Sequence, residues 1–252
     1  MRFDIVSLFP ELFSAFLTSG ITRRAFESGQ VDVKLFNPRD FASGNYRRVD
    51  DRPFGGGPGM IMMAEPLTLC LQEIRSQRSE VPPVVLFSPV GRQLNHSIVT
   101  RWAQSQGAVL ICGRYEGIDQ RFIDAHVTEQ ISMGDFVLSG GEVPAMALLD
   151  AVARLQPGVL NAADSHEQDS FNPVLDGLLD CPHYTRPEVW GENGVPEILL
   201  SGHHEQIERW RRQQRLAITA RLRPELIDQA RRADKLSSDD EAFLSGLGCT
   251  AS

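Results

Sequence analysis

Two glycine-rich segments, each directly behind an apolar run, constrain this chain more than any other feature of its sequence. Gly113–Gly117 follows the run Ala108–Cys112, and Ser132–Pro144 begins where the run Glu129–Ser132 ends. Because glycine has no Cβ, backbone amides in such loops can approach a flat ligand and hydrogen-bond its edge. Two such loops at strand ends predict one small-molecule pocket formed mainly by main chain, although each motif alone is as typical of a turn or a helix cap. An enzyme is therefore the leading interpretation.

The first 160 residues alternate between strand-like and helix-like patterns. Segments with helical periodicity lie between the apolar runs, and the last of them is an apolar helix from Pro144 to Leu155. This alternation predicts an α/β fold whose mostly parallel sheet is covered by helices on both faces. The predicted strands are Phe3–Leu8, Val31–Phe36, Val84–Phe87, Ala108–Cys112 and Glu129–Ser132.

The texture of the sequence changes after Pro157-Gly158. Residues 161–172 carry acidic, amide and hydroxyl side chains with little apolar content, which is typical of a mobile linker. Helical patterns return after Ser201-Gly202 and again over 239–247. We therefore expect an α/β domain over residues 1–160, a flexible linker over 161–176 and a small all-α domain over 177–252.

Composition limits the class of protein. The net charge of -8 excludes a protein coated with basic surface, but not a nucleic-acid partner, because a local basic patch is enough to meet phosphates. The four cysteines form no CxxC pair, so we expect reduced thiols and no metal site. The amino-terminus has no cleavage-site chemistry, and no apolar run reaches the ~20 residues of a membrane span. We expect a cytoplasmic protein without a membrane partner.

An arginine-rich stretch contrasts with this acidic background. Between Glu205 and Arg223, six arginines stand against two glutamates. A solvated helix face and a face that meets RNA phosphates explain this asymmetry equally well. The six are Arg209, Arg211, Arg212, Arg215, Arg221 and Arg223.

A third glycine loop, Asp50–Met60, contains four glycines and two prolines. It is not a GxGxxG dinucleotide fingerprint, because Met60 occupies a position that requires glycine, and it is not a P-loop, because no Gly-Lys-Ser/Thr follows. A simple turn would explain the loop, but its density of glycine and flanking charge favours a functional surface.

In combination, these segments resemble the bacterial tRNA (guanine-N1)-methyltransferases of the SPOUT class. The resemblance extends over nearly the whole chain in the family's order and is far more specific than any single glycine motif. The matching segments are Ser7–Pro10, Val49–Met60, Gly113–Asp119, Gly134–Ala145, Ala163–Ser165, Asp169–Phe171, Gly177–Val189 and Leu199–Gly202.

The resemblance implies methyl transfer from S-adenosylmethionine to N1 of guanosine at position 37 of tRNA, next to the anticodon. It also implies a C-terminal trefoil knot in the α/β domain, tRNA and not DNA as the partner, and a homodimer whose active sites the helical domain completes. A requirement for Mg2+ is implied as well, although no carboxylate cluster in the sequence indicates a site.

The resemblance also assigns residues by position. Asp169 matches the family's general base and Arg154 its partner, although an aspartate in a polar segment is usually a solvated acid, and an arginine at a helix end usually complements the helix dipole. The donor pocket would use Pro89, Gly113, Tyr115, Glu116, Ser132, Met133, Gly134, Asp135, Phe136, Val137, Leu138, Gly140, Gly141 and Pro144. The substrate would contact Asp50, Arg52, Gly55, Gly59, Arg212 and Arg215.

The chemistry of methyl transfer gives these residue types a purpose. The guanine N1 must lose its proton, and a carboxylate is ionised at neutral pH and can accept it. A guanidinium can stabilise the negative charge that develops on the carbonyl oxygen of the base.

Two alternatives from other classes remain. A nucleotide-dependent α/β oxidoreductase is disfavoured by the broken GxGxxG spacing. A non-catalytic RNA-binding module would bind RNA without modifying it, and Asp169 and Arg154 would then be dispensable.

Overall fold

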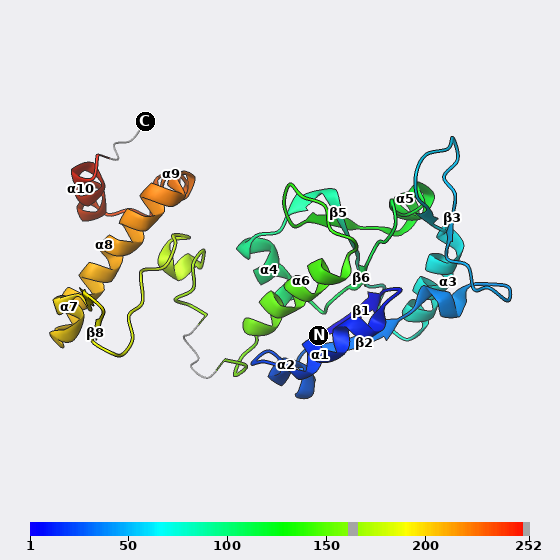
Figure 1. Ribbon diagram of the computed structural model, residues 1–252, viewed down its shortest axis with the longest axis horizontal. Helices are drawn as coiled ribbons and strands as arrows, with labels where there is room; N and C mark the ends of the chain where they lie inside the picture. The colour runs from blue at the N-terminus through cyan, green and yellow to red at the C-terminus, as the bar shows by residue number, and fades with distance from the viewer. Residues whose placement is uncertain (161–165, 249–252) are drawn as a thin grey trace. The chain divides into compact units, whose positions relative to one another are not determined.

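A five-stranded parallel sheet organises the first of the two units into which the chain divides, Met1–Asn161 and Ala162–Ser252 (Figure 1). The structure is a computed structural model that describes residues 1–160 and 166–248. Every strand pair in the sheet is parallel, which confirms the predicted α/β class. The spatial order is β2 (Asp32–Phe36), β1 (Arg2–Val6), β6 (Val109–Ile111), β5 (Val84–Gln93) and β7 (Glu129–Ser132).

Helices cover both faces of this sheet, because alternate side chains of the central strands enter two separate cores. Val85 and Leu110 pack in one core with α1 (Phe13–Thr18), α2 (Arg23–Glu27), α4 (His96–Ala103) and α6 (Glu142–Arg154). Val84 and Val109 pack in the other core with α3 (Ala64–Ser76) and α5 (Gln120–His126). Strands that are buried on both faces read as continuous apolar runs, which is why the sequence pattern predicts them.

Strand β5 is longer than the apolar run Val84–Phe87 predicts. It continues to Gln93 and pairs with β7 in two registers, with a shift between Phe87 and Arg92. A Cβ on Gly91 would lie 2.5 Å from the Gln130 carbonyl carbon, so only glycine allows the two backbones to meet there. The shift leaves residues 88–91 out of the paired register of β5 and β7.

Short elements complete the first unit. The one-turn helices η1 (Pro10–Leu12) and η2 (Pro38–Phe41) follow β1 and β2, and both begin with proline, which is preorganised for a first helical turn. The third glycine loop lies between β3 (Asp50–Asp51) and β4 (Ile61–Met62), which form an antiparallel pair.

The second unit is built mainly of helices around a small apolar core. The helices are α7 (Glu197–Leu200), α8 (His204–Leu222), α9 (Pro224–Arg232) and α10 (Ser238–Gly246), with the one-turn η3 (Pro173–Leu175) before them. The core consists of Leu178, Leu216, Ile227, Ala230 and Leu244. A short hairpin whose strands have two residues each, β8 (Val189–Trp190) and β9 (Asn193–Gly194), adds a strand pair that the all-α expectation omits.

Part of the predicted linker belongs structurally to this second unit. The Asn172 side chain donates to the His166 carbonyl at 2.9 Å and accepts from the Val174 amide at 2.9 Å, and Leu175 is buried. The matching segment Ala163–Ser165 lies outside the described residues.

Two buried thiols lie inside the first unit. Burial, aided by nearby carboxylates, raises the pKa of the Cys70 thiol to about 12. Burial and the charge of Glu142 also raise the pKa of Cys112. Cys70, Cys112 and Cys181 are free, and Cys249 lies outside the described residues. Among the helices of residues 1–160 and 166–248, none combines the length and apolar character needed to cross a membrane.

Replacing Gly107 by alanine tests the tight approach of the chain before β6. Gly107 has φ +95°, and a Cβ there would lie 1.9 Å from the Arg2 carbonyl oxygen. We expect Gly107→Ala to lower the free energy of unfolding by about 2–3 kcal/mol, because the substitution strains the backbone at position 107 and pushes this segment away from the backbone of Arg2. Urea unfolding followed by circular dichroism measures the change.

Gly246→Ala is the matched control. A Cβ at this position would meet open space, and its φ is not positive, so alanine in the last helix should change stability by no more than about 1 kcal/mol. Equal stability of Gly107→Ala and the wild type would contradict the described packing.

Candidate functional site

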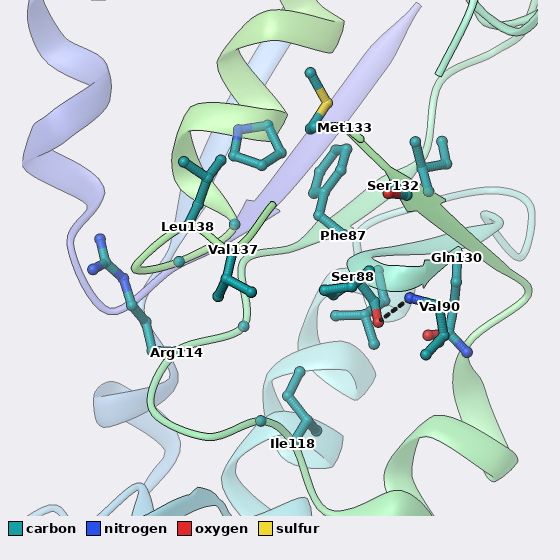
Figure 2. Close-up of a pocket in the computed structure, with 18 of the residues that line it drawn as sticks. Phe87, Ser88, Val90, Arg114, Ile118, Gln130, Ser132, Met133, Val137 and Leu138 are labelled. Atoms are coloured by element: carbon teal, nitrogen blue, oxygen red, sulfur yellow. Dashed lines mark hydrogen bonds between the residues drawn. The ribbon is translucent and has the colours of Figure 1, made fainter. Parts of the chain in front are cut away.

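A cavity of about 570 Å³ lies where β6 and β7 end and where β5 shifts register (Figure 2). Most of its lining comes from three segments, namely 86–90 of β5, 113–118 after β6, and 130–133 and 136–141 from β7 onward. Because β5 separates β6 from β7 in the sheet, all three segments meet at one edge. The carboxyl edge of a parallel sheet is the usual position of a ligand site in α/β folds, and this volume suits a small organic molecule.

Twelve of the fourteen residues predicted for a donor pocket line this cavity. The other two, Gly134 and Asp135, form the turn behind it. Gly134 has φ +138°, and its carbonyl accepts from the Phe136 amide at 2.9 Å. The twelve are Pro89, Gly113, Tyr115, Glu116, Ser132, Met133, Phe136, Val137, Leu138, Gly140, Gly141 and Pro144.

Sequence reasoning missed several lining residues from β5, from the loop after β6, from α5 and from β7 and the segment that follows it. Leu86 and Phe87 end the apolar run of β5 and Ser88 follows it, so the carboxyl end of this run is the signal that could have found them. The others not predicted are Val90, Arg114, Gly117, Ile118, Gln120, Ile123, Gln130, Ile131 and Ser139.

The two glycine loops are joined through main chain. The Gly141 amide donates to the Gly113 carbonyl at 3.0 Å. A Cβ on Gly141 would lie 2.6 Å from the Cys112 Cα, so a larger residue would separate the loops. The absence of a side chain at position 141 is therefore what allows the cavity wall to close.

The third glycine loop is tied to the first. The Glu116 amide donates to the Met60 carbonyl at 3.0 Å, and the Met62 amide donates to the Gly117 carbonyl at 2.9 Å. Gly59 has φ +74°, and a Cβ there would lie 2.5 Å from the Glu116 side chain. The loop that carries Asp50, Arg52, Gly55 and Gly59 therefore contacts the cavity through its last residues.

Tyr115 links the cavity to the same region through its side chain. Its backbone adopts φ +60°, and Arg39 donates to its hydroxyl at 3.5 Å. Partial burial raises the pKa of Tyr115, and the negative charge of the neighbouring Asp50 carboxylate raises it further. Tyr115, which is predicted for the methyl-donor pocket, therefore lies beside Asp50, which is predicted to contact the substrate.

A second cavity, of about 1000 Å³, lies beside β3 and β4. It is lined by residues 51–54 of the glycine loop, by 61–63 of β4 and the residue after it, by the start of α3, and by 118–121 at the start of α5. Arg52 is the predicted substrate residue that lines it, and Phe54 extends almost entirely into solvent, with 97% of its surface exposed.

Asp169 and Arg154 belong to different units of the structure. Arg154 is the last residue of α6, where a cation complements the helix dipole. Asp169 lies in the turns that precede η3, and its carbonyl accepts from the Asn172 amide at 3.2 Å. Their predicted partnership therefore involves both units.

Arg212 and Arg215 make ion pairs within the second unit. Arg212 donates to Asp240 at 3.0 Å and to Asp176 at 2.8 Å, and Arg215 donates to Asp180 at 3.2 Å. Burial alone would raise the pKa of Asp240, but hydrogen bonds from Arg212 and from Ser237 outweigh it and lower that pKa. These pairs give both arginines a role in stabilising the helices.

One group of potential metal ligands occurs among the described residues, Asp180, Cys181 and His183, whose ligand atoms lie within 4.8 Å of one another. The sequence spacing gives no sign of it. The Asp180 carboxylate is already engaged by Arg215 and by His183 at 2.8 Å. The Asp180 carboxylate is therefore held by side-chain contacts within the second unit.

Comparison with known proteins gives one consistent family. The family model described as tRNA (Guanine-1)-methyltransferase TrmD matches residues 1–229. A tRNA (guanine-N(1)-)-methyltransferase of Albidiferax ferrireducens is 81% identical over 97% of this chain and 98% of its own length. Proteins of the same name from Paracidovorax citrulli and Polaromonas sp. are 68% and 69% identical, each over 98% of this chain and over 98% and 97% of their own lengths.

Replacing Asp240 by asparagine tests the ion-pair network of the second unit. Because the folded pKa of Asp240 is lowered, its stabilisation is present above the unfolded value near ~4 and is lost as the pH falls through the folded value. We expect Asp240→Asn to lower the free energy of unfolding at pH 7 by about 1–3 kcal/mol. The free energy of unfolding of the variant should then decrease less than that of the wild type as the pH falls.

Unfolding curves measured from pH 3 to pH 7 give both quantities. The control is Asp239→Asn, an exposed neighbour on the same helix, which should keep the wild-type dependence on pH. An Asp240→Asn variant with the full acid sensitivity of the wild type would contradict the assigned role.

Proposed function

Because this chain belongs to the tRNA (guanine-1)-methyltransferase family, we propose that it transfers a methyl group from S-adenosylmethionine, bound in the 570 Å³ cavity, to N1 of guanosine 37 of tRNA. The family match establishes the tRNA (guanine-N1)-methyltransferase class, and it favours this class over an oxidoreductase and over a non-catalytic RNA-binding module. The position next to the anticodon is our proposal from the resemblance.

The observation that carries the proposal is the cavity wall made by two glycine loops joined through Gly141 and Gly113. Its volume and its apolar side chains, among them Phe87, Ile118 and Leu138, suit an adenosyl group, and its loop amides and carbonyls suit the edge of the base. When bound, S-adenosylmethionine supplies a methyl group activated by a positively charged sulfur. We propose that the loop residues hold and orient it there and exclude water.

We propose that Asp169 accepts the N1 proton of guanine and that Arg154 stabilises the negative charge on the carbonyl oxygen of the base. The match of Asp169–Phe171 to the family's pattern supports the first role, and the chemistry of methyl transfer supports both. Because the two residues belong to different units, this assignment requires the units to act together.

We propose further that the glycine loop with Asp50, Arg52, Gly55 and Gly59 binds the tRNA substrate. Its main-chain contacts with Glu116 and Gly117 support this role, because they place the loop beside the cavity. The role of Arg212 and Arg215 as RNA contacts stays a prediction. Their ion pairs hold them in place, and such pairs would have to be shared with phosphates.

The resemblance also leads us to propose a trefoil-knotted first domain, a cytoplasmic location and a homodimer that binds tRNA and not DNA. Val90, Phe136 and Val137 lie at the cavity with 57–84% of their surfaces exposed, which supports cover by another chain. The tight backbone packing at Gly91 and Gly141, where a Cβ would meet neighbouring main-chain atoms, supports the proposed knot.

The one group of three potential metal ligands among the described residues does not fit Mg2+. The group Asp180, Cys181 and His183 offers a thiol and an imidazole, whereas Mg2+ prefers oxygen ligands, and Arg215 places a positive charge beside it.

Incubation with unmodified tRNA tests the reaction and its site together. We expect the protein with S-adenosylmethionine to add one methyl group and to produce 1-methylguanosine next to the anticodon, because the family acts on guanine N1. Mass spectrometry of nuclease fragments identifies the modified nucleoside and its position. Methylation at another nucleotide, or none, would contradict the proposal.

Asp169→Asn tests the general base. The amide cannot accept the N1 proton, so we expect the single-turnover rate constant of methyl transfer to fall by about 10²–10⁴-fold while the Kd for S-adenosylmethionine stays unchanged. Glu167→Gln, an exposed neighbour two residues away, is the control and should keep wild-type turnover. Single-turnover assays at saturating tRNA measure the effect, and near wild-type turnover of Asp169→Asn would refute the assignment.

A further inference from the structure

We propose that Glu142 is a positioning residue for the donor site. Its buried carboxylate holds Arg114, and Arg114 links the two loops that form the cavity wall. The inference rests on the proposed function, because it assumes that the cavity binds S-adenosylmethionine.

Glu142 is a carboxylate in an apolar setting. It is the first residue of α6, where the helix dipole favours negative charge, and only 1% of its side chain is exposed. The Ser7 hydroxyl donates to its Oε1 at 2.6 Å, and Ser7 is itself fully buried at the end of β1. A charge this deeply buried is costly without partners, so its position depends on the groups around it.

Arg114 supplies the balancing charge and connects the loops. Its Nε lies 2.9 Å from Oε2 of Glu142, and its Nη1 donates to the Ser139 carbonyl at 3.2 Å. Its guanidinium stacks on the Phe9 ring, 4.6 Å from the centroid. In Figure 2 the Arg114 side chain leaves the loop after β6 and points away from Ser88 and Val90, which lie on another wall of the cavity.

The pair is held by charge more than by hydrogen bonding. Nε of Arg114 and Oε2 of Glu142 are buried, and neither has a hydrogen-bond partner of good geometry among the described residues. A Cβ on Gly140 would lie 2.3 Å from Arg114 Nε and 2.6 Å from Glu142 Oε2. Glycine at 140 therefore leaves room for the ion pair, and the ion pair fixes Gly140, which lines the cavity.

A second buried carboxylate in the same unit provides the comparison. Asp4 is fully buried and accepts from Arg2 at 2.8 Å and from Arg78 at 2.6 Å. None of these three residues lines the cavity. Loss of either carboxylate should lower stability, but only loss of Glu142 should alter the donor site.

Glu142→Gln in the full chain tests the proposal, because the amide oxygen keeps the hydrogen bond from Ser7 and only the charge is removed. We expect the Kd for S-adenosylmethionine, measured by calorimetry, to rise about tenfold, and the KM for tRNA to stay within twofold of the wild type. Asp4→Asn should lower the unfolding temperature at least as much and leave the donor Kd unchanged.

Arg114 variants extend the test and stand in if Glu142→Gln does not fold. Arg114→Gln should raise the donor Kd about as much as Glu142→Gln, and Arg114→Lys, which keeps the charge, should restore part of the affinity. In the double variant Glu142→Gln/Arg114→Gln the Kd should rise no further than in either single variant, because the two residues act through each other.

Wild-type donor affinity in both Glu142→Gln and Arg114→Gln would overturn the inference. So would an equal loss of affinity in Asp4→Asn, because the effect would then follow from general destabilisation. If the wild-type protein itself does not bind S-adenosylmethionine, the proposed function fails and takes this inference with it.

Discussion

The cavity depends on a main-chain hydrogen bond, 3.0 Å long, from the Gly141 amide to the Gly113 carbonyl. It joins the loop after β6 to the segment that leads from β7 into α6, and a side chain at position 141 would overlap the backbone of Cys112. The Arg114–Glu142 ion pair lies beside this contact and connects the same two loops through side chains. The main-chain hydrogen bond and the buried ion pair therefore fix the two loops at this edge of the sheet together. Because the polar groups there are paired with one another, a polar site can lie directly above the apolar core.

The sequence predicts the parts of the fold that depend on burial. Val84–Phe87 and Ala108–Cys112 are found as strands because both faces are covered, and the run of apolar residues records this directly. The extension of β5 through Gln93 has no such pattern, because it depends on the backbone contact of Gly91 with β7. Helix α9 is missed for a related reason, since its buried face consists only of Ile227 and Ala230.

The candidate site shows the same division. The glycine loops are visible in the sequence because glycine marks close backbone approach, and most residues predicted from them do line the cavity. The buried hydrogen bonds and ion pairs are not visible, because their partners are distant in the chain. Ser7 and Glu142 are 135 residues apart, and Arg212 and Asp176 are 36 apart. A count of arginines on α8 cannot distinguish charges that stabilise the domain from charges that meet RNA.

The buried thiols of Cys70 and Cys112 have a practical consequence. A thiolate is the form that alkylating reagents attack, and in the native state burial keeps both groups protonated and out of reach. Modification of either sulfur thus requires the sheet to open first. The rate at which a reagent such as iodoacetamide labels each one would report how often its side of the sheet is exposed, since Cys70 lies in one core and Cys112 in the other.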